Sequence, residues 1–435
     1  MKIAILGYDV EGRASFDYFA AQDGHELTVC DRNPAVQVPE GVPSMLGEGY
    51  LDDLDRFDLL VRTPGLPPEA ILEKNPGVAN KVTSLINEFL KVCPTRNVIG
   101  VTGTKGKGTT SALIARMLQA AGKDVRLGGN IGVPPLQFLP ELTAESWVVL
   151  ELSSFQLVDL RASPHIGVCL MVVPEHLDWH PAMDHYAAAK SRLFAAQETG
   201  DVAIYFADNE ESRRIAAAGH GRKLPYFAPP GACISDGTVV IEDETICRTD
   251  ELRLLGKHNW QNVCAAVTAA WQVVQDVAAL RSVLTSFSGL AHRLELVREL
   301  HGVRYYDDSF GTAPETAMVA IEAFEQPVIA ILGGRSKGIP FDALAKFVAQ
   351  RPNVKQVITI GETGPEIAAL LRRRGFDRNR MREGGNTMDQ IVRTAQELAE
   401  PGDVVLLSPA CTSFDMFQNY KERGERFTEA VRALA

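Results

Sequence analysis

A glycine-rich turn at residues 100–110 constrains the fold of this chain more than any other feature. The turn reads GVTGTKGKGTT; residues 97–99 (NVI) before it are expected to form a short strand, and the residues from Ser111 onwards a helix. Such a turn exposes backbone N–H groups at the positive end of the helix dipole, which suits the phosphates of a nucleotide. Because glycine, lysine and threonine coincide at this junction, the sequence predicts an α/β domain that binds ATP.

Two side chains of this turn carry chemistry. Lys107 supplies a positive charge for the terminal phosphates, and the Thr109 hydroxyl can ligate a phosphate-bound Mg²⁺. The spacing departs from the common G-x4-G-K-[ST] motif, because position 101 is valine and Gly108 follows the lysine. The alternative is a solvated glycine–threonine turn without a ligand. The residues expected around the nucleotide phosphates are Gly103, Thr104, Lys105, Gly106, Lys107, Gly108, Thr109 and Thr110.

The length of 435 residues is too great for one ordinary core, and the sequence divides into three blocks. Each block opens with an apolar strand that leads into glycine, and strands alternate with helices after it. We predict three doubly wound α/β domains: a Rossmann-like domain at 1–92, a central P-loop ATPase-type domain at 93–289 and a second Rossmann-like domain at 290–435. Residues 221–255 are expected to form a small antiparallel insert.

The composition excludes several classes of protein. The apolar content of 46% and charged content of 23% are those of a globular protein, and the net charge of −11 argues against nucleic acid as the main partner. No apolar run reaches 18 residues and no signal-peptide pattern is present, so we expect no membrane insertion. The seven cysteines form no Cys-x-x-Cys pair, which argues against a disulfide framework or a zinc site and favours the cytoplasm.

Two further residues are candidate ligands for cations. Glu151 ends an apolar strand, and a carboxylate at the carboxyl edge of a sheet beside a phosphate loop is well placed to hold Mg²⁺. His176 follows the apolar run 167–173 and is a candidate ligand of a second cation. The structural alternatives are a solvated strand end for Glu151 and a hydrogen-bonded structural histidine for His176.

Several polar residues lie at expected strand or helix ends. Asn259 and Asn262 are one helical turn apart, just before a helix expected to begin near Val263, so they could either read an adenine edge or cap that helix. Arg293 and Asp308 could reach phosphate or ribose from the third block. The glycine-rich turn at 333–338 and the hydroxyl-bearing turn at 408–415 are expected to bind a substrate carboxylate rather than to be plain turns.

The first block carries half of a dinucleotide-binding fingerprint. Gly7 and Gly12 follow the first strand, and Asp31 ends the second strand about twenty residues later. The middle glycine of the fingerprint is replaced by Asp9, which would crowd a pyrophosphate. The sequence therefore argues against dinucleotide binding here, and leaves open a site for one end of a nucleotide or a purely structural role.

Taken together, these motifs resemble the Mur ligase family, and the resemblance extends over nearly the whole chain. The segments at 151–157 (ELSSFQL) and 407–413 (LSPACTS) are similar to those of the glutamate-adding members. The other motifs that carry the resemblance lie at 102–110, 128–132, 175–176, 186–190, 258–262, 292–293 and 308–309.

The resemblance implies an ATP-dependent, amide-forming ligase of peptidoglycan precursor synthesis. In such a ligase ATP phosphorylates the carboxylate of UDP-N-acetylmuramoyl-L-alanine, and the amine of glutamate, expected to be D-glutamate, then displaces phosphate. Two Mg²⁺ ions are implied: Thr109 and Glu151 would hold the first, and His176 with a carbamylated Lys190 the second. Lys107, Glu151, His176 and Lys190 would be the catalytic residues.

The resemblance also assigns binding roles. The residues that would hold ATP, besides the phosphate loop, are Asn259, Asn262, Arg293 and Asp308. Those expected at the incoming glutamate are Thr312, Lys337, Ser413 and Tyr420. Those expected along UDP-N-acetylmuramoyl-L-alanine are Asn130, Ser153 and Gln156 for its lactoyl-alanine arm, and Val10, Glu11, Arg32 and Asn33 for its uridine end.

Four positions depart from the family pattern. Gly108 stands in place of serine, Met171 in place of asparagine, and Phe310 and Ala313 in place of a lysine and an asparagine. These departures leave three alternatives open: an L-glutamate-adding variant of the ligase, a folylpolyglutamate synthase-like ligase, and a non-catalytic nucleotide-binding protein. We expect a monomer.

Overall fold

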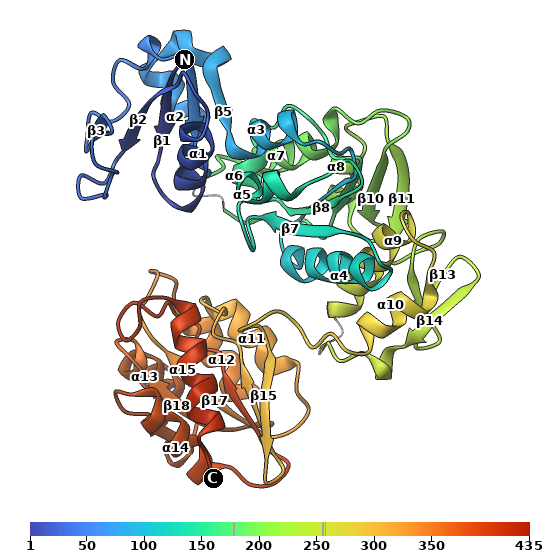
Figure 1. The fold of residues 1–435 in the computed structure, drawn as a ribbon. Coiled ribbons are helices and arrows are strands. Elements are labelled where there is room, and N and C mark those ends of the chain that lie inside the picture. Colours follow the sequence, from blue (N-terminus) through green and yellow to red (C-terminus); the bar gives the residue numbers. More distant parts are fainter. Residues whose placement is uncertain (177–178, 255, 257) are drawn as a thin grey trace. The chain divides into compact units, whose positions relative to one another are not determined.

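The computed structural model describes residues 1–176, 179–254, 256 and 258–435, and divides the chain into two compact units (Figure 1). The first unit comprises Met1–Leu252 with Trp260–Ser286, and the second Arg253–Asn259 with Phe287–Ala435. Both units are built on parallel sheets with helices packed on them, so the predicted α/β class is confirmed. The division into three domains at residues 92 and 289 stays a prediction.

The first sheet of unit one is parallel, with the strand order β3-β2-β1-β4-β5. Phe16 and Phe19 of α1 pack on one face, and Ile71 of α2 contributes to a second cluster that also contains Leu60 of β4. Asp9 caps α1 by accepting from the backbone N–H groups of residues 11 and 12. The elements are β1 (Lys2–Leu6), α1 (Val10–Ala20), β2 (Glu26–Asp31), β3 (Ser44–Leu46), β4 (Leu59–Arg62), α2 (Pro68–Lys74), β5 (Val82–Ser84) and α3 (Leu85–Val92).

A buried ion pair ties this sheet to a later part of unit one. Arg62, at the end of β4, is fully buried, and its Nε and Nη2 donate to Asp159 at 2.7 and 2.6 Å. Removing the guanidinium leaves a largely buried carboxylate without its partner. We therefore expect Arg62→Met to lower the free energy of unfolding by about 3 kcal/mol in urea titrations. The matched control, Lys74→Met, breaks an exposed pair with Asp52 and is expected to cost less than about 1 kcal/mol. Equal losses in both variants would contradict the assignment.

The second sheet of unit one has the order β11-β10-β9-β6-β8-β7 and places β6 between two buried neighbours. Its strand β6 ends in the glycine-rich turn, as predicted, but α4 begins at Lys107 rather than at Ser111. The helix starts early because Gly106 takes a left-handed conformation, with φ of 86°, and serves as the N-cap. The elements are β6 (Val98–Thr102), α4 (Lys107–Ala120), β7 (Val125–Gly129), α5 (Pro135–Phe138), β8 (Trp147–Glu151), α6 (Ser154–Leu157), β9 (Ile166–Cys169), α7 (Met183–Ala195), β10 (Val202–Phe206), α8 (Glu210–Ala216) and β11 (Arg222–Tyr226).

The predicted antiparallel insert is present but shorter than expected. Residues 222–226 join the parallel sheet as β11, and only the later strands form a separate antiparallel sheet. The following helix begins at His258 rather than near Val263, so Asn259 and Asn262 lie inside its first turns. The elements are β12 (Cys233–Ser235), β13 (Thr238–Ile241), β14 (Glu244–Arg248), α9 (His258–Trp271) and α10 (Val277–Leu284).

Unit two contains one six-stranded sheet with the order β15-β16-β20-β17-β18-β19, in which only β15 is antiparallel. Buried side chains of α11, α12 and α13 form one apolar cluster with the sheet, and those of α14 and α15 form another. The elements are β15 (Glu295–Leu300), β16 (Val303–Asp307), α11 (Pro314–Glu322), β17 (Val328–Gly333), α12 (Asp342–Gln350), β18 (Val354–Ile360), α13 (Gly364–Arg373), β19 (Met381–Glu383), α14 (Met388–Leu398), β20 (Val404–Leu407) and α15 (Tyr420–Arg432).

This strand order creates topological switch points at the carboxyl edge of the sheet. The helix that follows β20 packs with one cluster, whereas the helices that follow its neighbours β16 and β17 pack with the other. In open α/β sheets, ligands bind where adjacent strands send their helices to opposite faces. The turns after β16, β17 and β20, which contain the predicted glutamate-site residues, therefore lie at such switch points.

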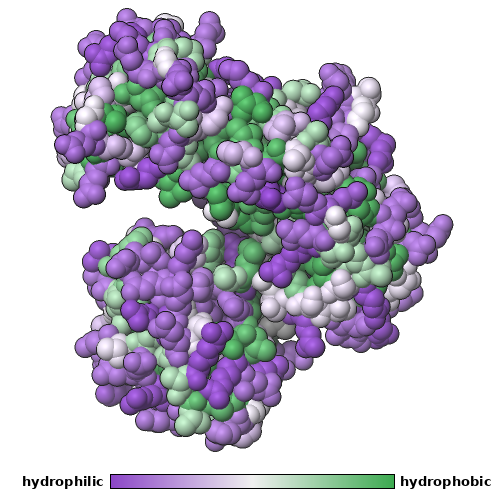
Figure 2. Space-filling model, viewed as in Figure 1, coloured by the Kyte–Doolittle hydropathy of each residue, from purple (hydrophilic) through white to green (hydrophobic). Residues whose placement is uncertain are grey.

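The face of the protein shown in Figure 2 is predominantly hydrophilic, with apolar residues scattered over it. Among the described helices, none combines the length and the apolar character needed to cross a membrane.

Candidate active site

The turn between β6 and α4 has the shape of an anion cradle that only glycine permits. Gly103 and Gly106 have φ of 146° and 86°, values that favour glycine. A Cβ on Gly106 would lie 2.1 Å from Asn262 Oδ1, and a Cβ on Gly103 would lie 2.6 Å from the Leu170 Cβ. No side chain of the described residues caps the N-terminus of α4. Its first N–H groups therefore face the turn without a side-chain acceptor, which fits a phosphate group.

Two lysine side chains converge on one carbonyl group of this turn. Lys107 Nζ donates to the carbonyl oxygens of Gly103 and Thr104 at 3.2 and 3.1 Å. Lys190 Nζ, on α7, donates to the same Gly103 oxygen at 2.9 Å. Lys190 is only 1% exposed, and burial, reinforced by the positive charge of Lys107, lowers its pKa to about 7. Lys190 is therefore poised to exist as a neutral amine near neutral pH.

Glu151 lies close enough to Lys190 to influence its pKa. It ends β8, is 2% exposed, and its carboxylate raises the pKa of Lys190, although burial outweighs that effect. Asn130 holds the carboxylate in place, because its Nδ2 donates to Glu151 Oε1 at 3.2 Å. The hydroxyl of Thr109, on the first turn of α4, is the other oxygen ligand predicted at this edge of the sheet. A carboxylate and a hydroxyl beside a phosphate cradle are the donors that Mg²⁺ prefers, so this donor set fits the ion.

His176 lies in the segment that follows β9, and its ring is 6.5 Å from that of Tyr186 on α7. Its φ of 57° is left-handed, and its ring lies 4.9 Å from that of Phe155. The neighbouring residue Glu175 forms an ion pair with Lys105 of the phosphate loop. His176 thus follows a segment that is anchored directly to the glycine-rich turn.

Tyr186 is a residue of this site that sequence reasoning missed. The centre of its ring lies 6.5 Å from that of His176 and 4.4 Å from Lys190 Nζ. Its hydroxyl lies 3.1 Å from Thr104 Oγ1. The signal in the sequence was the spacing of four residues between positions 186 and 190, which puts both side chains on one face of a helix.

Asn262 also contacts the phosphate loop, since the Thr110 hydroxyl donates to its Oδ1 at 3.4 Å. Asn259, three residues earlier, is buried at the start of α9. Contact with the loop places Asn262 near the expected nucleotide; a role for either residue in reading adenine stays a prediction.

Residues predicted along the UDP-linked substrate have partners within the protein. Ser153 caps α6, and Gln156 completes a capping box with it. The Gln156 Nε2 also donates to Glu11 Oε1 at 2.5 Å, so a ligand would have to replace that hydrogen bond to reach either side chain. Val10, Arg32 and Asn33 are exposed, and their role at the uridine end stays a prediction.

The buried carboxyl group of Glu11 predicts a pH effect on stability. Burial raises the pKa of Glu11 to about 7, and its Oε2 is buried with no hydrogen-bond partner among the described residues. The folded protein thus keeps a proton that the unfolded chain releases above about pH 4.3. This contribution is complete below that pH and is lost as the pH rises to about 7.

We therefore expect Glu11→Gln to gain stability relative to the wild type between pH 5 and pH 8, by about 1–3 kcal/mol. Urea unfolding of both proteins at the two pH values measures this difference. A constant difference between them would show that Glu11 is ionised in the folded state throughout this range.

Unit two brings together some of the residues predicted to bind glutamate. Lys337 Nζ donates to the Thr312 hydroxyl at 2.9 Å, which joins the turns after β17 and β16. Ser413, in the turn after β20, is buried. Asp308 accepts a hydrogen bond of 2.6 Å from the Ser408 hydroxyl, and burial raises the pKa of Asp308 to about 7. All these turns lie at the carboxyl edge of one sheet.

Arg293 precedes β15 and stacks over the ring of Phe310, with 4.1 Å between its guanidinium carbon and the ring centre. Tyr420, predicted at the glutamate site, begins α15 and contacts the same ring. The roles of all these residues in binding ATP or substrates stay predictions.

Comparison with protein families matches two regions of the chain. The sequence model of the Mur ligase middle domain matches residues 101–270, and that of the Mur ligase glutamate ligase domain matches residues 292–411. The first match contains the phosphate loop, Glu151, His176 and Lys190, and the second contains Arg293 and Asp308.

Curated relatives match over the full length of the chain. The UDP-N-acetylmuramoylalanine–D-glutamate ligase of Symbiobacterium thermophilum is 40% identical, over 100% of this chain and 98% of the relative. The proteins of the same name from Acetivibrio thermocellus and Clostridium botulinum are 37% and 34% identical, and cover 100% of this chain with 96% and 97% of their own length.

Solved structures share the fold at low sequence identity. MurF from Acinetobacter baumannii has a TM-score of 0.62 at 15% identity and covers 98% of this chain and 93% of its own. The UDP-N-acetylmuramate-alanine ligase from Thermotoga maritima has a TM-score of 0.60 at 17% identity, with 100% and 99% covered. With the full-length relatives and both matched domains, these likenesses lead to one conclusion. The chain belongs to the Mur ligase family.

Proposed function

We propose that this protein is the ligase that joins D-glutamate to UDP-N-acetylmuramoyl-L-alanine with consumption of ATP. The observation that carries the proposal is the full-length identity of 34–40% to relatives named for this reaction. The phosphate cradle, with Lys107 and Glu151 at its edge, is the part of the described structure that fits it best.

The proposed reaction has two steps. In the first, an oxygen of the alanine carboxylate attacks the γ-phosphorus of ATP, the bond to the bridging oxygen breaks, and ADP leaves. In the second, the glutamate amine attacks the carbonyl carbon of the acyl phosphate, inorganic phosphate leaves with the former carboxylate oxygen, and the amine gives up a proton. Both steps place two anionic reactants side by side, so positive charge is the main requirement of the site.

The residues of unit one would meet this requirement in different ways. Lys107 would contact the terminal phosphates, and the N–H groups at the start of α4 would hold phosphate oxygens. Thr109 and Glu151 would hold one Mg²⁺, and His176 with a modified Lys190 a second. When bound, Mg²⁺ supplies charge neutralisation between the phosphate and the carboxylate.

The modification we propose for Lys190 is carbamylation. A neutral lysine amine adds to CO₂ to give a carbamate and a released proton, and the lowered pKa of Lys190 supports the neutral form. The carbamate would also be attracted to Lys107, whereas the protonated amine of Lys190 is repelled by it. That anion would be an oxygen ligand suited to Mg²⁺.

The names of the relatives favour D-glutamate over the L-enantiomer. Thr312 and Lys337, joined by a hydrogen bond, would meet the incoming amino acid together with Ser413 and Tyr420. The L-glutamate-adding variant remains the alternative, because Phe310 and Ala313 replace a lysine and an asparagine beside Thr312. We further propose that the protein acts in the cytoplasm as a monomer; its seven free cysteines fit a reducing compartment.

The test is a ligation assay with purified protein, ATP, Mg²⁺, UDP-N-acetylmuramoyl-L-alanine and either glutamate enantiomer. We expect ADP, phosphate and the D-glutamyl product in equal amounts, measured by mass spectrometry and phosphate release. Product with L-glutamate alone would establish the variant, and product with a folate alone would establish the folylpolyglutamate alternative. No product with any acceptor would favour the non-catalytic alternative.

A further inference from the structure

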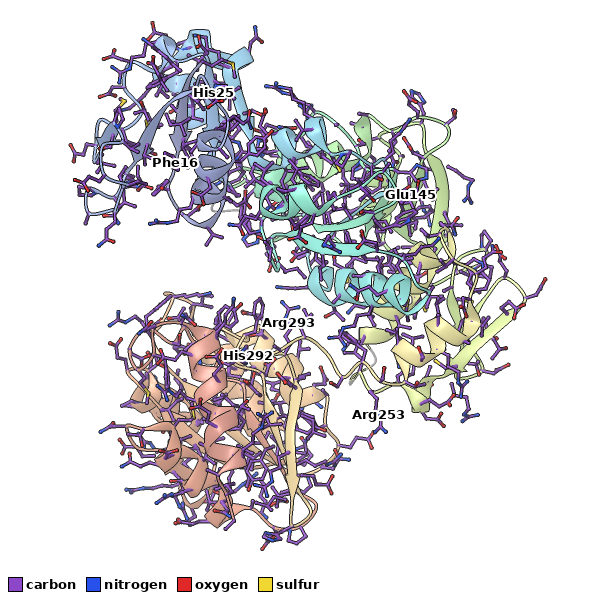
Figure 3. All side chains as sticks on the ribbon, in the orientation of Figure 1. Phe16, His25, Glu145, Arg253, His292 and Arg293 are labelled. Carbon is purple, nitrogen blue, oxygen red and sulfur yellow. The ribbon has the colours of Figure 1, made fainter. Side chains whose placement is uncertain are left out.

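The chain around Arg293 is held in an unusual conformation. His292 and Leu294, the residues on either side, both have left-handed φ values, of 60° and 45°. A non-glycine residue in this region is uncommon, and two that flank one side chain indicate that the surroundings determine the backbone there. His292 and Arg293 are labelled in Figure 3, on the segment that leads into β15.

Hydrogen bonds hold this corner from several directions. His292 Nδ1 lies 2.7 Å from the buried Asp307 Oδ2, and the backbone N–H of His292 donates to Glu295 Oε2 at 2.9 Å. The backbone N–H of Leu294 donates to Asp308 Oδ1 at 3.3 Å. The ring of His292 has no room to move towards α15, because a Cβ added to Gly424 would lie 2.1 Å from its Nδ1. The backbone of Arg293 is therefore fixed on both sides.

The side chain of Arg293 is fixed by an aromatic pair. Its guanidinium carbon lies 4.1 Å from the centre of the Phe310 ring, and that ring meets Tyr420 edge-on, at 5.1 Å and 85°. Phe310 is 39% exposed, although it is large and apolar. Its backbone N–H donates to the His292 carbonyl oxygen at 3.0 Å, so the ring and the arginine corner are joined directly.

Hydrogen bonds also hold the backbone of Tyr420 in place. The Ser309 hydroxyl donates to the Tyr420 carbonyl oxygen at 2.7 Å, and Nε of the buried Arg423 donates to that hydroxyl at 2.9 Å. Phe310 thus lies between an arginine whose backbone is fixed and a tyrosine whose backbone is fixed. An exposed phenylalanine on such a support presents its ring face to a cation.

We infer that Phe310, backed by Tyr420, is a positioning residue that fixes the orientation of the Arg293 guanidinium for its role in binding ATP. The inference rests on the proposed ATP-dependent function and on the role in holding ATP that the family resemblance implies for Arg293. It gives Phe310 a role on the nucleotide side of the reaction, although the family usually has a lysine there beside the amino-acid site. Phe310 then replaces that lysine with a side chain of different chemistry, and its presence does not indicate that the site has lost its activity.

The kinetic test compares three substitutions. Phe310→Leu keeps an apolar side chain but removes the ring, Phe310→Trp keeps a ring face, and Val319→Ala removes an exposed apolar side chain elsewhere in unit two. We expect Phe310→Leu to lower kcat/KM for ATP by about three- to tenfold while the KM for glutamate stays within twofold. Phe310→Trp and Val319→Ala should retain wild-type values. In an Arg293→Lys background, Phe310→Leu should have a smaller effect, because the stacked guanidinium is already absent.

An NMR measurement without substrates separates this inference from the proposed function. The ring of Phe310 should move the Nε–H resonance of Arg293, assigned with Arg293→Lys, to lower frequency in the wild type, and Phe310→Leu should abolish that shift. Failure of the wild type in the ligation assay would refute the proposed function while leaving this readout intact. A resonance unchanged in Phe310→Leu, or a loss confined to the KM for glutamate, would overturn the inference.

Discussion

Replacing Lys107 with alanine is expected to lower kcat by about a hundred- to a thousandfold, the usual cost of removing one donor aimed at developing charge. In the structure Lys107 Nζ rests on two carbonyl oxygens of the phosphate loop, 3.1 and 3.2 Å away, and points over the turn rather than into the core. Its loss should therefore leave the fold intact. The measurement is the rate of phosphate release under saturating ATP, together with the melting temperature.

The control for this variant lies at the other end of the same helix. Lys123 is exposed just beyond α4, so Lys123→Ala removes an equal charge at a distance from the phosphate loop. We expect it to retain wild-type turnover. Turnover within tenfold of wild type in Lys107→Ala would mean that another group neutralises the terminal phosphates.

Replacing Lys190 with methionine is expected to separate activity from stability. The variant keeps the apolar stem of a side chain that is 1% exposed, but removes a charge that burial and Lys107 both disfavour. The melting temperature should therefore stay the same or rise. The kcat should fall by at least about a hundredfold, because a ligand of the second Mg²⁺ is lost.

A direct spectroscopic readout accompanies this variant. Wild-type protein in ¹³C-bicarbonate should show a carbamate resonance that is absent from Lys190→Met. Lys190→Arg, which keeps a positive charge but cannot form the carbamate, should be as inactive as Lys190→Met. Activity in Lys190→Arg, or a carbamate signal that persists in Lys190→Met, would contradict the assignment.

The parts of the site that could be predicted from sequence are those encoded in short segments. The phosphate loop is one, since two glycines with left-handed φ, a lysine and two threonines all lie within eight residues. Glu151 is another, because a strand of continuous apolar residues that ends in an acid points to the carboxyl edge of a sheet. In each case the local pattern determines both the backbone and the chemistry.

The role of Lys190 could not be predicted from the local sequence pattern. Three alanines precede it on α7, and by itself the sequence does not distinguish it from a surface lysine; only the family resemblance singled it out. Its burial and its lowered pKa arise from tertiary packing, which brings the Gly103 carbonyl of the turn and the charge of Lys107 on α4 against it.

The predicted start of α4 was wrong for a more local reason. The expected start of α4 at Ser111 followed the first apolar residues, but the helix begins four residues earlier, where Gly106 supplies the cap and the threonines continue the turn. In the sequence, Phe310 stands where the family usually has a lysine, which suggests that a positive charge is lost. Only the stacking of Arg293 on its ring shows that Phe310 makes a favourable contact. The local cap at Gly106 determines the start of α4, and packing within unit two determines the contact of Phe310.

Oxygen-18 in the carboxyl group of UDP-N-acetylmuramoyl-L-alanine provides the most direct test that this protein activates a carboxylate by phosphorylation. With ATP and D-glutamate, each phosphate released should carry one ¹⁸O atom and the amide product should retain the other. Phosphate released without label, with both ¹⁸O atoms still on the unreacted substrate, would mean that water alone receives the phosphoryl group, and would contradict the ligase mechanism proposed for this site.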